Sequence, residues 1–163
     1  YLTKYTTDDK PFSDARLDSL AACIDSYGVE SVLDIGGMDG ELVFRLAELT
    51  KNVVAAGVGN VRISEKFQSV VLSHTFEHIY DTSAMFERIE SAIVPSGMLF
   101  IEIPIHLNYT APTNYDYHWQ HINKFRPQDI ETLFIKNSFT IETSQQIDDY
   151  REYKVWRIIG KKV

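Results

Sequence analysis

The sequence predicts one α/β domain, built on a doubly wound, mostly parallel sheet that ends in a C-terminal antiparallel hairpin. Three observations lead to this prediction. A short apolar run stops in a glycine-rich turn and continues as a helix, apolar runs alternate with amphipathic segments along the chain, and two stretches of alternating residues lie near the C-terminal end. With 163 residues, the chain is long enough for a single substantial core.

The first elements predict a strand and a glycine turn between two helices. Ser13 can cap a helix whose apolar residues recur at helical spacing down to Gly28. The apolar run at 31–35 predicts a strand, which stops in the glycine-rich residues 36–40. Apolar residues at helical spacing over 42–49 predict the next helix. A strand, a glycine turn and a helix in this order open a Rossmann-like sheet.

The middle of the chain continues the alternation of strands and helices. Residues 53–56 predict a weaker strand, and residues 69–72 predict a buried one. Asp81 can cap an amphipathic helix, which we expect to end in the turn residues 95–97. The near-continuous apolar run at 98–103 is typical of a parallel strand that is covered on both faces.

The last third of the chain predicts a long loop, a helix and a hairpin. Residues 104–126 are polar and aromatic, and a loop of this length indicates function rather than a plain connection. Pro127 can begin a helix. The alternating stretches 139–143 and 153–159 then predict the closing hairpin.

Charge and composition argue against several kinds of partner. The formal net charge of −7 provides no global attraction to nucleic acid or an anionic membrane, and no apolar run approaches the ~20 residues that span a bilayer. Cys23 is the only cysteine, so no intrachain disulfide can form, which favours a reducing, cytoplasmic location. Homodimer formation stays open. We expect the basic residues near the C-terminal end to be solvated: Arg151, Lys154, Arg157, Lys161 and Lys162.

The glycine turn is the first candidate functional site. Glycines let the backbone approach a ligand and the following helix offers free N–H groups, although tight packing alone also selects such a turn. Residues 32–40, V-L-D-I-G-G-M-D-G, resemble the first motif of class I S-adenosylmethionine (SAM)-dependent methyltransferases, an acidic residue followed by G-x-G-x-G. Met38 replaces the second glycine of that motif. The form D-I-G-x-x-D-G is similar to the variant found in sugar C-methyltransferases.

Later stretches extend the resemblance over roughly residues 30–140. The strand at 69–72 is followed by H-T-F-E-H-I at 74–79, and V-P-S-G at 94–97 replaces the common K-P-G-G turn. The stretch H-W-Q-H-I-N-K-F-R-P at 118–127 is similar to the H-x-x-H-I-N-x-F-x-P stretch of many of these proteins. Together these motifs imply the class I methyltransferase fold, with SAM as the cofactor.

The resemblance also implies roles for single residues. Asp34 and the backbone of the glycine turn would hold the methionine end of SAM, and the residues after the 69–72 strand would border it. His121 falls where sugar C-methyltransferases place a histidine near the methyl acceptor, and an imidazole that titrates near neutrality can remove the acceptor's proton. The implied cofactor-binding residues are Asp34, Gly36, Gly37, Asp39, Gly40, His74 and Thr75, and the implied catalytic residues are His121 and His118.

The resemblance favours a small-molecule methyl acceptor, such as a nucleotide-linked sugar or a glycan precursor, over protein or nucleic acid. Sugar C-methyltransferases often carry a zinc-binding amino-terminal domain whose cysteines are not found in this sequence. C-, O- and N-methylation therefore all stay open. The main alternative is a non-catalytic binding or scaffold protein on a methyltransferase fold, which Met38 in the glycine motif favours.

The connection after the second predicted strand departs from the family pattern. Only the 26 residues from 41 to 66 separate Gly40 from Phe67, whereas the family has a helix, two strands and two further helices there. A single βαβ unit already takes ~30 residues, so a segment of ~25 residues is missing from the pattern near 55–64. The acidic residue that grips the ribose is missing with it. Either the domain is shortened here or the sequence lacks this segment, and we favour the second explanation.

The histidines allow two further interpretations. Residues 74–78 fit H-x-x-E-H, the inverted zinc-protease motif, which needs both histidines on one face of an established helix. The first histidine follows a predicted strand, so we expect Glu77 and His78 to make local polar contacts instead.

A metal site made by the histidines of the long loop is the other interpretation. His106, His118 and His121 could bind zinc, iron or nickel through their imidazoles. No cysteine helps them, and Asp116 is the only carboxylate nearby. The sequence therefore favours a site without a metal.

Overall fold

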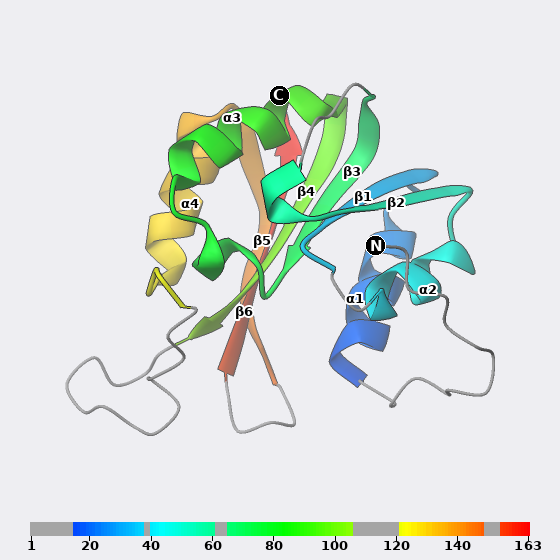
Figure 1. Cartoon of the computed structure of the whole chain (residues 1–163), viewed down its shortest axis with the longest axis horizontal. Helices are drawn as coiled ribbons and strands as arrows, with labels where there is room; N and C mark the ends of the chain where they lie inside the picture. The colour runs from blue at the N-terminus through cyan, green and yellow to red at the C-terminus, as the bar shows by residue number, and fades with distance from the viewer. Residues whose placement is uncertain (1–14, 38–39, 61–64, 106–120, 149–153) are drawn as a thin grey trace.

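The chain forms a six-stranded sheet between two layers of helices (Figure 1). The computed structural model describes residues 15–37, 40–60, 65–105, 121–148 and 154–163. In spatial order the strands are β2 (Asn52–Ala56), β1 (Ser31–Ile35), β3 (Phe67–Ser73), β4 (Ile93–Ile105), β6 (Lys154–Lys162) and β5 (Phe139–Asp148). The first four strands pair in parallel and the last two pair antiparallel, which confirms the predicted doubly wound sheet with a C-terminal hairpin.

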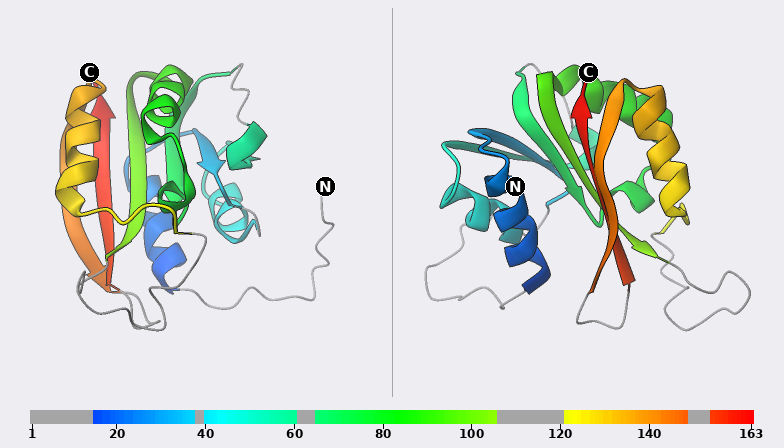
Figure 2. Two further views of the ribbon diagram at one scale, coloured as in Figure 1. Left: turned by 60° about the vertical axis from the view of Figure 1, so that its left-hand side comes forward. Right: turned by 180° about the vertical axis from the view of Figure 1, so that it is seen from behind.

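Helices cover both faces of this sheet (Figure 2). The helices are α1 (Ala15–Ser26), α2 (Glu41–Ala47), α3 (Thr82–Ala92) and α4 (Pro127–Lys136), and η1 (Val58–Asn60) and η2 (Phe76–His78) are single 3-10 turns. Successive strand residues point to opposite faces, so Val32 packs in the core with α1 and α2, whereas Leu33 packs in the core with α3 and α4. Within the described ranges, no helix is both long and apolar enough to span a membrane.

The turn predicted at 95–97 lies within the span of β4, where the pairing with β3 is irregular and Ser96 has φ +61°. The strand begins at Ile93, which pairs with Phe67, and the next pair joins Met98 to Ser69. Five residues of β4 therefore advance beside two residues of β3. The extra residues must leave the plane of the ladder, as in other β-bulges.

Arg157 is not solvated, contrary to the prediction, because it belongs to a buried ion-pair cluster. The residue is 3% exposed, and its Nε donates to Glu102 Oε1 at 2.8 Å. Arg16 of α1 pairs with the other carboxylate oxygen, and Ser73 Oγ donates to that oxygen at 3.0 Å. One carboxylate thus joins α1, β4 and β6 at the carboxyl end of β3. The sequence contains a signal for this cluster: Glu102 lies within the apolar run 98–103, and a charged residue in a buried strand needs a partner of opposite charge.

The strand β2 is poorly covered and lies at one edge of the described sheet. It pairs only with β1 among the described strands, and Val54 is 37% exposed. Its connection to β3 consists of η1 and a few residues, of which 61–64 lie outside the described ones. β2 is thus an apolar edge strand with a short crossover, and it is the part of the sheet that the segment predicted to be missing near 55–64 would cover.

The intact mass of the purified protein tests this prediction. If the sequence lacks a segment, the protein should be heavier than 18.7 kDa by the mass of ~25 residues. The extra residues would supply the missing crossover helix and cover β2. A measured mass of 18.7 kDa would instead mean that the domain itself is shortened.

Candidate functional site

The glycine turn lies against the turn that follows β3, at the carboxyl ends of the parallel strands. Gly36 has φ +92°, and a Cβ atom added there would come within 2.2 Å of Thr75 Oγ1. The Gly36 N–H donates to the carbonyl of Ala56 at the end of β2, at 2.8 Å. Two of the segments that the sequence predicts to hold the cofactor, 34–40 and 74–75, are therefore in direct contact.

Asp34 lies beneath the glycine turn. It is 1% exposed, and a Cβ atom added at Gly37 would lie 2.1 Å from Asp34 Oδ2. Only a glycine at position 37 lets the turn approach this carboxylate. Gly40 then begins α2, where its carbonyl accepts from the N–H of Phe44 at 3.0 Å. Asp39, the other acidic residue of the motif, lies outside the described residues.

The residues after β3 form a tight, partly buried turn. His74 has φ 50°, and its N–H donates to the carbonyl of Glu102 at 3.1 Å. Thr75 is 4% exposed, and its hydroxyl donates to the carbonyl of Ser73 at 3.1 Å. Phe76 is fully buried and fixes η2 to the core. The established helix that the zinc-protease interpretation requires is not formed here, because His74 precedes a single 3-10 turn.

The segment that carries His121 packs directly on η2. The Asn123 N–H donates to the carbonyl of Glu77 at 3.0 Å, and Asn123 Nδ2 donates to the carbonyl of Ile79 at 2.6 Å. The rings of Phe125 and Phe76 pack with their centroids 5.3 Å apart. These contacts bring His121 to η2.

His121 is half-buried and lies edge-on against His78, with the ring centroids 4.9 Å apart. The structure thus brings His121 to the carboxyl-end edge of the sheet, next to the turn that holds His74 and Thr75. His118, its predicted catalytic partner, lies outside the described residues, as does His106.

Glu77 is the functional candidate that sequence reasoning missed. It is 1% exposed, and neither of its carboxylate oxygens has a hydrogen-bond partner among the described residues. Its Oε1 lies 3.7 Å from His74 Nδ1 and 3.8 Å from His78 Nε2, beyond hydrogen-bond distance. Burial raises the pKa of the Glu77 carboxyl to about 7. The sequence signal is the pair Glu77–His78, which follows the end of the buried strand β3 by four residues and for which the sequence predicts only local polar contacts.

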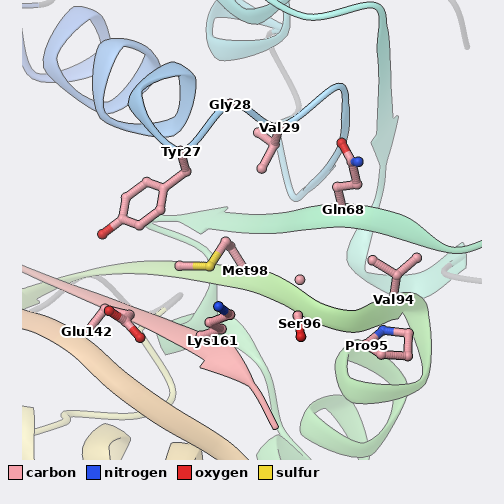
Figure 3. A pocket seen from close by; sticks show the side chains of 11 residues that line it. Tyr27, Gly28, Val29, Gln68, Val94, Pro95, Ser96, Met98, Glu142 and Lys161 are labelled. Carbon is pink, nitrogen blue, oxygen red and sulfur yellow. The ribbon is translucent and has the colours of Figure 1, made fainter.

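A separate pocket lies at the opposite end of the sheet (Figure 3). Its volume is about 340 Å³, and it is lined by residues at the amino ends of β3 and β4, including Gln68 and Met98. Tyr27, Glu142 and Lys161 also line it. Since the glycine turn leaves the carboxyl end of β1, this pocket is not part of the predicted cofactor site.

Comparisons with known proteins find similarity in structure but not in sequence. Neither a family model nor a curated protein matches the sequence. The structure is similar to that of the 1,6-didemethyltoxoflavin-N1-methyltransferase of Burkholderia thailandensis, solved with 1,6-didemethyltoxoflavin and S-adenosylhomocysteine bound. The TM-score is 0.75 at 15% identity, over 93% of this chain and 80% of that one.

Two further structures show how widely this fold is used. The N-methyltransferase NodS of Bradyrhizobium japonicum, in complex with S-adenosylhomocysteine, has a TM-score of 0.68 at 13% identity, over 95% of this chain and 89% of that one. The [4+2]-cyclase SpnF has a TM-score of 0.68 at 10% identity, over 89% of this chain and 81% of that one. With the predicted sheet confirmed, this chain has the fold of the class I SAM-dependent methyltransferases.

Proposed function

We propose that this protein is a SAM-dependent methyltransferase that acts on a small molecule. The observation that carries the proposal is the contact between the glycine turn and Thr75 at the carboxyl ends of β1 and β3. Ligands of open α/β sheets bind outside these ends, where the backbone of a glycine turn can approach them closely. The methyltransferases of similar structure that were solved with S-adenosylhomocysteine support SAM as the cofactor.

In this proposal the glycine turn and the turn after β3 hold the cofactor. Gly36 and Gly40 already donate their N–H groups to Ala56 and Gly37, so the donors that can face the methionine carboxylate of SAM are the N–H groups of Gly37 and of the first residues of α2. Asp34, buried beneath the turn, fixes the turn's shape and offers a negative charge near the methionine ammonium group. His74 and Thr75 border the same space.

His121 is proposed to remove the proton of the methyl acceptor. Methyl transfer is an in-line displacement from a sulfonium, so the protein must align the acceptor with the methyl group, exclude water and take up a proton. A half-buried imidazole at the carboxyl-end edge is suited to the last task. His118, three residues earlier in the chain, is proposed to shape the acceptor pocket. A nucleotide-linked sugar or a glycan precursor is the acceptor class that we propose to assay first.

A second candidate function is a binding or scaffold protein that keeps the fold without methyl transfer. Met38 in the glycine motif and the lack of an acidic residue at 55–57 favour it. The [4+2]-cyclase of similar structure also supports this second candidate, because a cyclase on this fold means that the fold alone does not imply methyl transfer.

A methyl-transfer assay separates the two functions. The protein is incubated with SAM that carries a labelled methyl group and with acceptors of three kinds: sugar nucleotides, phenols and amines. An enzyme should form S-adenosylhomocysteine and labelled acceptor in equal amounts, with one kind of acceptor preferred. If SAM binds and no label is transferred to any acceptor, the binding-protein function is the correct one.

A further inference from the structure

We propose that Glu77, His78 and His121 together bind one divalent transition-metal ion. One ligand atom from each residue, a carboxylate oxygen or an imidazole nitrogen, lies within 4.8 Å of the other two. Two imidazoles and one carboxylate are a ligand set that first-row metals use in open sites, with further coordination positions left for water or substrate. A bound ion would occupy the His121 imidazole, so proton removal by His121 is proposed for the metal-free protein, and the inference on metal binding does not depend on the identity of the methyl acceptor.

The distances between the three ligand atoms need to shorten only slightly for the residues to hold an ion. Metal–ligand distances of about 2.0–2.1 Å with tetrahedral angles place two ligand atoms ~3.4 Å apart. Glu77 Oε1 and His78 Nε2 are already 3.8 Å apart. The remaining pairs lie within 4.8 Å, which changes in side-chain torsion can shorten.

The environment of Glu77 provides a second, independent indication. Its carboxyl group is almost completely buried, and its two oxygens have no hydrogen-bond partner among the described residues. A buried polar group without a partner is costly, and a buried carboxylate normally pairs with a cation or coordinates a metal. Glu77 Oε1 lies 3.7 Å from His74 Nδ1 and 3.8 Å from His78 Nε2. A metal ion between the three ligands would supply the missing partner.

The fold holds the three ligands on two segments that are far apart in sequence but tightly joined. Glu77 and His78 belong to η2, which the buried Phe76 anchors in the core. Asn123 donates two hydrogen bonds to η2 and to the residue that follows it, and so fixes the segment of His121. The side chain of His78 is 32% exposed, so an ion can reach the cluster from solvent.

The ligand types select the kind of ion. Imidazole suits zinc, copper, iron and nickel, whereas magnesium and calcium prefer sites made of oxygen atoms alone. We therefore expect a first-row transition metal, and Zn²⁺ is the probe for the tests. This site differs from the H-x-x-E-H protease site, in which His74 would be a ligand and Glu77 would not.

The test is a calorimetric titration of the chelator-treated protein with Zn²⁺ alone. The wild type should bind one ion per chain. Glu77→Gln, His78→Asn and His121→Asn should each weaken binding by at least ~100-fold, since loss of an outer partner of a ligand already costs ~10- to 100-fold. His74→Asn is the matched control on the same turn, and it should change the affinity only a few-fold.

A measurement on the wild type avoids any effect of the substitutions on folding. Diethylpyrocarbonate modifies accessible imidazoles, and peptide mass spectrometry locates the modified residues. Zn²⁺ should lower the modification of His78 and His121 and leave that of His74 unchanged. The proposal is overturned if Zn²⁺ does not bind stoichiometrically, if the three ligand variants bind it as the wild type does, or if His74 is protected in place of His121.

Discussion

Replacing His121 by alanine is expected to lower the turnover of methyl transfer by ~100- to 10,000-fold, the range that a general base contributes. The affinity for SAM should stay nearly unchanged, because the ring of His121 packs against His78 of η2, outside the residues proposed to hold the cofactor. A loss confined to kcat would show that the imidazole acts in the reaction and not in cofactor binding. The assay uses chelator-treated protein, in which no metal ion occupies the ring nitrogens.

The pH dependence of the rate and two further variants complete this test. The wild type should show a limb near neutrality, where an imidazole usually titrates, and His121→Ala should lack it. His118→Ala should lower the turnover less than His121→Ala does if His118 only shapes the acceptor pocket. Ile122→Ala is the control: this neighbouring side chain is 55% exposed, so its removal should leave the rate of methyl transfer unchanged. An unchanged rate in His121→Ala would end the general-base proposal.

Replacing Glu102 by glutamine is expected to lower the free energy of unfolding by about 3–5 kcal/mol. The carboxylate lies between Arg16 and Arg157, and all three residues are less than 10% exposed. Glutamine keeps the shape but removes the negative charge that lies between the two buried guanidinium groups. Urea denaturation of the two proteins measures the difference.

An exposed ion pair provides the control for Glu102. Glu30 and Lys51 form a contact of 2.6 Å, but their side chains are 59% and 77% exposed. Glu30→Gln should therefore change the stability by less than about 1 kcal/mol. If Glu102→Gln has an equally small effect, the buried cluster does not contribute to joining α1 to the sheet.

The periodic elements could be predicted because their signals are local. The strand–glycine–helix unit at 31–47 and the paired alternating stretches at the C-terminal end follow from side-chain spacing and turn residues alone. The contact between the glycine turn and Thr75 also follows from the fold class, since neighbouring parallel strands end at the same edge.

Features that depend on distant partners could not be predicted in the same way. The burial of Arg157 has no local signal, because its partners lie 55 and more residues away in the chain. The bulge in β4 depends on the register against β3, which no local pattern around 95–97 specifies. The cluster of Glu77, His78 and His121 needs the docking of residues 121–126 on η2, and Asn123 provides this docking through hydrogen bonds to backbone carbonyls.

Calorimetry with SAM tests most directly the claim that the glycine turn holds the cofactor. The wild type should bind one SAM per chain, and Gly36→Val should weaken binding by ~10- to 100-fold, because the new side chain must push against Thr75 and shift the turn. Gly59→Val is the matched control, since a Cβ atom there meets no described atom within 4 Å and the residue lies outside the ribose position at 55–57. The titration is carried out at a temperature where circular dichroism shows that all three proteins are folded. Equal SAM affinity for Gly36→Val and the wild type, or no SAM binding by the wild type, would contradict the account.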